Sequence, residues 1–101
     1  MLAHNVYFTL NDNSPAARQT LLDACAQYLT DHSGMVSSAC GVLRDDHARP
    51  VNDRDWDVGL HILFTDKAAH DAYQDSARHH QFVAESQGNW KRARVFDTEL
   101  G

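Results

Sequence analysis

The side chains in this sequence that are suited to acid–base chemistry include seven histidines and three tyrosines. An imidazole titrates near neutral pH and can take a proton from a carbon next to a carbonyl group, and a phenol can donate a hydrogen bond to the enolate oxygen that forms. His4 alternates with Val6 and Phe8, so it is expected on the apolar face of a strand. Tyr73 follows Ala69 at helical spacing, which predicts that it faces that strand. Acid–base chemistry is therefore the chemistry that these residues favour.

The histidines show no metal-binding pattern, and we predict neither a metal site nor a cofactor. His79 and His80 are adjacent and point in different directions, and no pair has the His-x₃-His or Glu-x-x-His spacing that puts two ligands on one side of a helix. His61 and Asp57 are expected on one strand face, which leaves open a divalent-ion site repeated across a dimer, although solvated polar groups are the simpler interpretation. The isolated glycines form neither a P-loop nor a dinucleotide-binding motif.

Hydrophobic periodicity predicts the elements that must position these side chains. Alternating residues predict four strands, at residues 4–10, 35–43, 56–64 and 92–99. Helical spacing predicts one helix after the cap Ser14-Pro15 and a second after the cap Thr65-Asp66, with Gly34 ending the first. The charged segment 44–54 has no periodicity and is expected to be a loop. The order is β-α-β-β-α-β in a single domain of residues 1–101.

Length and composition restrict the class of protein. At 101 residues, with 43% hydrophobic and 23% charged residues, the chain has the size and composition of one globular domain. Its formal net charge of −5 repels phosphate backbones and anionic lipid, so neither nucleic-acid nor membrane partners are expected. Cys25 and Cys40 lack CxxC spacing and are interpreted as small buried apolar groups. The N-terminal segment has no basic region and no long apolar run, which predicts a cytoplasmic protein.

The order of elements predicts an α+β fold of the ferredoxin-like type, in which the helices cover one face of a four-stranded antiparallel sheet. The apolar face of strand 56–64, which includes Trp56, is expected beneath the helices. On the opposite face, Tyr7, Leu63 and Val95 are expected to form an exposed apolar patch large enough to mark an interface. We therefore expect two copies to pack their sheets face to face as a homodimer.

Three sequence motifs occur in order along the chain. They are His4-Asn5-Val6-Tyr7-Phe8, then Trp56-Asp57-Val58-Gly59-Leu60 leading to Phe64, then Ala72-Tyr73 followed by His79-His80-Gln81-Phe82-Val83. With these motifs, nearly all of the chain resembles the stress-responsive A/B-barrel domain family, whose members are dimeric α/β barrels. The family usually reads Ala-Tyr-x-x-His-Pro-x-His-x-x-Phe in the last segment, and this sequence has Ser76-Ala77 where His-Pro is usual.

The resemblance implies a site as well as a fold. In a polyketide cyclase of the family, the residues matching His4, Tyr73 and His79 line a pocket between helices and sheet. There a histidine acts as base in an aldol-type ring closure, and the tyrosine orients or polarises a carbonyl. These three are the candidate catalytic residues here, although a further pocket histidine of the cyclase aligns with Val58. The alternative interpretation is structural, with His79 bonding a backbone carbonyl and Tyr73 filling the core.

The expected function is that of a homodimeric domain, of unassigned biochemical role, that binds a small apolar or carbonyl compound between helices and sheet. The alternative is a cofactor-free enzyme, cyclase-like or monooxygenase-like, that uses histidine and tyrosine as acid and base; the monooxygenase version rests on fold analogy alone. The cavity volume distinguishes a ligand-binding or catalytic domain from a purely structural one, because a ligand needs about 300 Å³ or more. A purely structural module would have that space filled by Phe8, Phe64, Phe82 and Trp90.

Overall fold

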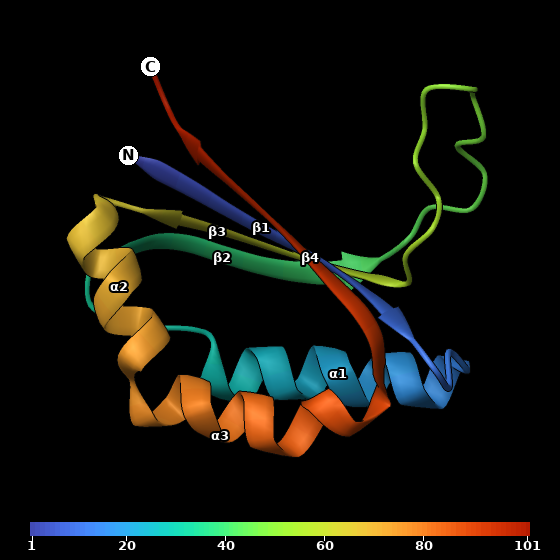
Figure 1. Ribbon diagram of the computed structural model, residues 1–101, viewed down its shortest axis with the longest axis horizontal. Coiled ribbons are helices and arrows are strands. Elements are labelled where there is room, and N and C mark those ends of the chain that lie inside the picture. The colour runs from blue at the N-terminus through green and yellow to red at the C-terminus, as the bar shows by residue number, and fades with distance from the viewer.

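The computed structural model describes residues 1–101 as one four-stranded antiparallel sheet with helices packed against it (Figure 1). The strands are β1 (Leu2–Leu10), β2 (Met35–Val42), β3 (Val58–Phe64) and β4 (Trp90–Glu99), and they lie in the order β2-β3-β1-β4. The helices are α1 (Pro15–Tyr28), α2 (Lys67–Asp75) and α3 (Ala77–Ser86), and a short 3₁₀ turn, η1 (Gln87–Asn89), precedes β4. The predicted element order and antiparallel sheet are confirmed.

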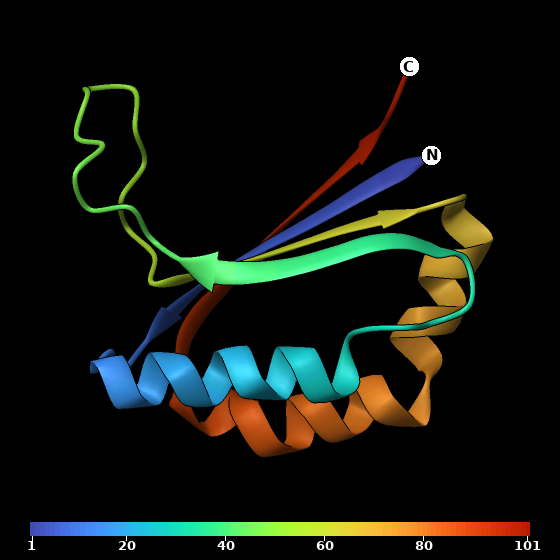
Figure 2. The same ribbon diagram turned by 180° about the vertical axis from the view of Figure 1, so that it is seen from behind.

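The helices cover only one face of the sheet. Figures 1 and 2 show α1 and α3 side by side beneath it, with α2 standing at one end. The β2–β3 loop extends away from the body at the other end. None of the three helices is long and apolar enough to pass through a membrane. The two chain ends are adjacent, because the amide of Leu100 donates a hydrogen bond of 2.9 Å to the carbonyl oxygen of Met1.

Local sequence determines both the start of α1 and the turn between this helix and β2. The Ser14 hydroxyl accepts a hydrogen bond from the amide of Ala17, and proline occupies the first turn, as predicted. The prediction that Gly34 ends this helix is wrong, because α1 ends at Tyr28. Gly34 has a φ of 78° in the turn before β2, where a Cβ would collide with that of Ala69 on α2. The glycine therefore allows α2 to approach the sheet closely.

A single serine separates α2 from α3, whereas the sequence pattern predicted one helix after the cap Thr65-Asp66. Ser76 ends α2 and begins α3. Its hydroxyl donates to the carbonyl oxygen of Tyr73 at 2.8 Å and accepts from the amide of His79 at 3.1 Å. Since one hydroxyl bonds the backbone of both residues, it fixes the position of Tyr73 relative to His79.

The hydrophobic core lies between the sheet and the helices. Alternate residues of β1 and β3 point into it, as their periodicity predicts. Its buried members are Val6, Phe8, Leu10, Leu21, Cys25, Tyr28, Leu29, Val58, Leu60, Ile62, Phe64, Tyr73 and Phe82. Both cysteines are free: Cys25 is buried, and Cys40 is partly buried against the core.

Val95 and Trp56 lie on the face opposite to the predicted one. Val95 is paired with Val6 in the sheet register, so it points toward the helices, and its neighbour Phe96 takes its place on the open face. Trp56 precedes β3 and packs its ring against Tyr7, with a centroid distance of 4.9 Å, on the open face. An aromatic patch therefore lies on the open face, but its residues differ from the predicted ones. The ring of Tyr7 packs against Trp56 on one side and against Phe96 on another.

Asp57 and His61 do not share a face, so the divalent-ion site considered for them is wrong. The Asp57 side chain accepts a hydrogen bond of 2.8 Å from the amide of Leu10 and lies 3.5 Å from the guanidinium of Arg18 on α1. These bonds turn Asp57 inward just before the regular alternation of β3 begins. His61 instead bonds the side chain of Asn5 on the open face, at 2.8 Å.

Candidate functional site

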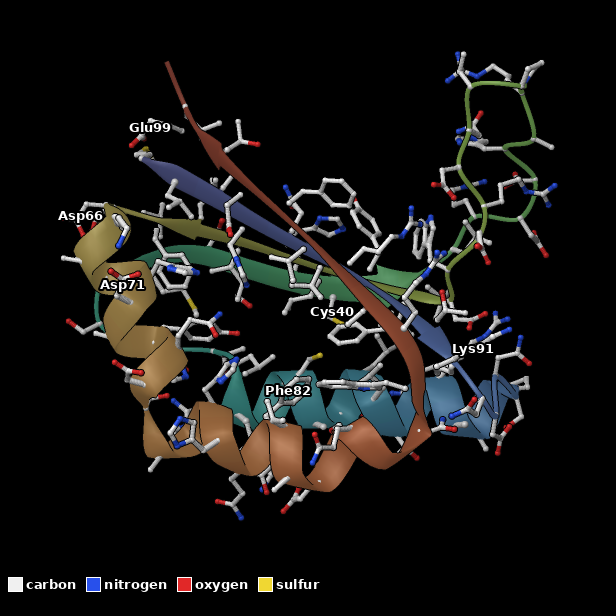
Figure 3. The ribbon with its side chains drawn as sticks, in the orientation of Figure 1. Cys40, Asp66, Asp71, Phe82, Lys91 and Glu99 are labelled. Atoms are coloured by element: carbon white, nitrogen blue, oxygen red, sulfur yellow. The ribbon has the colours of Figure 1, made fainter.

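A cavity of about 410 Å³ lies between the covered face of the sheet and helices α2 and α3. The three predicted site residues, His4, Tyr73 and His79, all line it. Nine of the fourteen lining residues are hydrophobic, and the full set is His4, Val6, Phe8, Leu60, His70, Tyr73, Gln74, His79, Phe82, Val83, Trp90, Ala93, Val95 and Asp97. Phe82 points from α3 toward the sheet (Figure 3) and forms part of the wall.

The strand register gives the cavity a polar end and an apolar end. His4 on β1 is paired with Asp97 on β4, and further along the same two strands Phe8 is paired with Ala93. At about 3.3 Å per residue, the two pairs lie about 13 Å apart. The ring of Trp90 stands 4.8 Å from that of Phe8 at the apolar end. A molecule with a polar head and an apolar body matches this arrangement.

His4 is the most deeply buried polar side chain of the cavity, at 3% exposure. Its Nδ1 lies 2.6 Å from a carboxylate oxygen of Asp97. Burial lowers the pKa of His4, and the hydrogen bond to Asp97 opposes that shift only in part. The ring is therefore a neutral imidazole at pH 7, oriented by a carboxylate as the histidine of a Ser-His-Asp triad is.

Tyr73 belongs to both the core and the cavity wall. Its ring centroid lies 6.1 Å from that of His4 and 4.9 Å from that of His79, so it is a neighbour of both histidines. Burial raises the pKa of the Tyr73 phenol, which keeps it protonated. A buried protonated phenol is a hydrogen-bond donor, and a carbonyl oxygen in the cavity is the kind of acceptor that it suits.

His79 brings a second neutral imidazole to the cavity from α3. Its Nδ1 is buried and has no hydrogen-bond partner, so the ring does not bond a backbone carbonyl as the structural interpretation expected. Burial lowers the pKa of His79, and the neighbouring imidazoles, His80 and His4 foremost, lower it further. An unprotonated imidazole with a free nitrogen is able to accept a proton.

Three polar residues that line the cavity, His70, Gln74 and Asp97, are not among the residues predicted from the sequence. His70 precedes Tyr73 by three positions on α2, which puts both on one helix face, and this spacing was the available signal. The His70 ring lies 4.8 Å from that of His4. Asp97 is close to His4 only through the pairing of β1 with β4, and no local spacing reveals that contact.

The fold and the site together define a ferredoxin-like α+β domain with an amphipathic cavity between its helices and its sheet. A family model described as the Stress responsive A/B Barrel Domain matches residues 2–100. The chain belongs to this family, as its motifs predicted.

Solved structures share the fold at low sequence identity. A dimeric ferredoxin-like protein of unknown function from Thermobifida fusca is 16% identical, with a TM-score of 0.81, over 98% of this chain and 90% of that chain. A Dabb family protein with a ferredoxin-like fold from Mesorhizobium loti is 23% identical, with a TM-score of 0.79, over 99% and 97%. An antibiotic biosynthesis monooxygenase is 12% identical, with a TM-score of 0.75, over 100% and 99%. The curated proteins contain no match. These likenesses establish the fold.

Proposed function

We propose that this domain binds a small compound that has an apolar body and a carbonyl group, in the cavity between its sheet and α2 and α3. The observation that carries the proposal is the volume of about 410 Å³, which exceeds the roughly 300 Å³ that a small ligand needs. Phe8, Phe82 and Trp90 line this space and leave it open. The Tyr73 phenol donates to the carbonyl oxygen, and the apolar body lies toward Trp90.

The second candidate function is cofactor-free acid–base catalysis on such a compound. The observation that favours it is the His79 imidazole, which lines the cavity beside the ring of Tyr73 and makes no side-chain hydrogen bond within the chain. His79 takes a proton from the carbon next to the carbonyl and becomes an imidazolium, while the electron pair moves to the oxygen that Tyr73 hydrogen-bonds. The likeness to a monooxygenase is consistent with catalysis on this fold but supports no particular reaction.

Ligand binding can be measured through the tryptophan in the cavity wall. In a Trp56→Phe protein, Trp90 is the only remaining tryptophan, so its fluorescence reports the cavity. Titration with a panel of aryl ketones and medium-chain aldehydes should quench it saturably for some members. Ala93→Phe places a ring at the cavity mouth and should weaken that binding at least about 10-fold, whereas Ala26→Phe, at an exposed position on α1, should not. Quenching by no compound, or equal binding by Ala93→Phe, would contradict the proposal.

We also infer that the chain forms a homodimer through the open face of its sheet. Tyr7, Trp56 and Phe96 form a cluster of edge-to-face rings there, and Phe96 is 50% exposed. Gly59 is buried beneath this cluster, and the rings of Tyr7 and Trp56 pack closely over the position where a Cβ would lie. Aromatic residues on an exposed sheet face are typical of protein interfaces. The Thermobifida fusca structure with this fold is described as dimeric, which supports the inference.

Phe96→Asp should convert this dimer into monomers, because a carboxylate would have to be buried without a partner between the two sheets. Light scattering of the wild-type protein at micromolar concentration should give twice the chain mass of 11.4 kDa, and the variant should give the single-chain mass. Val51→Asp, at an 82% exposed loop position, is the matched control and should remain dimeric. A monomeric wild-type protein would show that the open face has another use.

A further inference from the structure

We propose that His4, His70 and Asp97 form a binding site for a divalent transition-metal ion of the zinc type at the polar end of the cavity. One ring nitrogen from each histidine and one carboxylate oxygen from Asp97 lie within 4.8 Å of one another. Two imidazoles and one carboxylate are the ligand set of many catalytic zinc sites and of non-haem iron sites. The proposal goes beyond the proposed function, because neither ligand binding nor proton transfer by His79 requires an ion.

The surroundings of His70 are those of a metal ligand. Its Nδ1 lies 3.0 Å from a carboxylate oxygen of Asp71, which also binds Lys67. Figure 3 shows Asp71 on α2, the helix at the Glu99 end of the sheet. A histidine that donates one ring N–H to a carboxylate presents the lone pair of its other nitrogen, and metal-binding histidines almost always have such a partner.

The free nitrogen of His70 is the second observation in favour of an ion. Its Nε2 is buried and has no hydrogen-bond partner in the chain. A buried polar atom without a partner costs free energy, and such atoms in a native protein call for an explanation. An ion between His70, His4 and Asp97 supplies the missing partner. Zinc binds imidazole nitrogen and carboxylate oxygen at about 2.0–2.2 Å, so one ion can contact all three side chains at once.

The other two ligands are already in contact, and the site has a route to solvent. His4 Nδ1 and the Asp97 oxygen stand 2.6 Å apart and share a hydrogen, which a bound ion would displace. Ligand atoms around one tetrahedral zinc ion lie about 3.4 Å apart, so modest side-chain rotations bring the group to one ion. The Asp97 side chain is 44% exposed, which provides an entry path. Three protein ligands would leave a fourth coordination position for a water molecule or a ligand oxygen.

Cobalt provides the test, because Co²⁺ takes zinc sites and its visible absorption reports the coordination. Protein without a histidine tag should bind one Co²⁺ per chain, and Zn²⁺ should displace it. His70→Gln and Asp97→Asn should each weaken Co²⁺ binding at least about 100-fold, since each removes a ligand. Asp71→Asn should weaken it about 10-fold or more through the orientation of His70. His80→Gln, an exposed histidine on the neighbouring helix, is the matched control and should bind as the wild type does.

The experiment needs no organic ligand, so it is independent of the proposed function. Far-ultraviolet circular dichroism verifies that each variant is folded. If His70→Gln does not fold, Asp97→Asn at its part-exposed position gives the same test. Absence of a stoichiometric Co²⁺ spectrum in the wild type would overturn the proposal. So would equal affinity of the wild type and Asp97→Asn, or an equal loss in His80→Gln.

Discussion

Phe64→Ala should lower the free energy of unfolding by about 3–5 kcal/mol, the cost of replacing a fully buried phenylalanine with alanine and leaving a cavity. Phe64 is completely buried at the end of β3, and its ring lies 5.1 Å from Tyr73 and 5.6 Å from His70. Thermal unfolding at one fixed protein concentration should show a midpoint lower by about 12 °C or more. The fixed concentration matters because dissociation of a dimer would also change the midpoint.

Val36→Ala is the matched control for this substitution, because Val36 is a strand residue with 53% exposure. Its effect should stay within about 0.5 kcal/mol. Phe64→Ala should also weaken the binding of cavity ligands, because the Phe64 ring packs against His70 and Tyr73 in the cavity wall. A loss of less than about 1 kcal/mol in Phe64→Ala would show that this end of the core is loosely packed and that the cavity walls are not rigid.

His79→Ala should slow turnover about 10²–10⁴-fold on any carbonyl compound that the cavity transforms, equivalent to about 2.7–5.5 kcal/mol in the activation free energy. The expected cause is the loss of the unprotonated imidazole that accepts the proton next to Tyr73. His79 is half-buried and makes no side-chain hydrogen bond that holds the fold. The unfolding temperature of the variant should therefore change little. His80→Ala, at the adjacent exposed position, should retain the wild-type rate within about twofold.

The pH dependence of kcat/KM gives a second measurement of the same role. A base works in its unprotonated form, and burial lowers the pKa of His79 below its ordinary value of about 6.5. The rate should therefore be at its plateau at pH 7 and fall as the pH decreases through that lowered pKa. The residual kcat/KM of His79→Ala should not show this decrease at low pH. Equal turnover by His79→Ala, or an acid limb centred above about 6.5, would remove His79 from catalysis.

The fold could be predicted because each strand has one apolar face. In β1, Val6 and Phe8 alternate with residues on the open face. If the register of the strand shifted by one residue, its apolar side chains would turn from the core to the open face. The prediction was wrong for Trp56 and Asp57, which precede β3, because side-chain bonds and ring packing position them there and periodicity does not. Val95 was placed on the wrong face because β4 is an exposed edge strand with a weak pattern.

The candidate site could be predicted in part. The sequence pointed to His4, Tyr73 and His79, and the structure brings all three to one cavity. Asp97 could not be predicted, because its contact with His4 spans 93 positions of the chain and depends on the register of two strands. The contribution of His70 could be predicted from helical spacing, which puts it on the same face of α2 as Tyr73.

Ser76 has a consequence for how this protein could acquire new specificities. Its hydroxyl bonds the backbone of both Tyr73 and His79, so the relative position of these two residues is set within α2 and α3 and not by β4. The opposite wall is β4, where Ala93 and Val95 line the cavity at exposed positions of an edge strand. Mutations there can reshape the space for the ligand body at little cost in stability. Under the proposed function, the residues that contact the carbonyl group and those that select the ligand body would therefore belong to different elements, and the range of bound compounds could diversify while Tyr73 and His79 are retained.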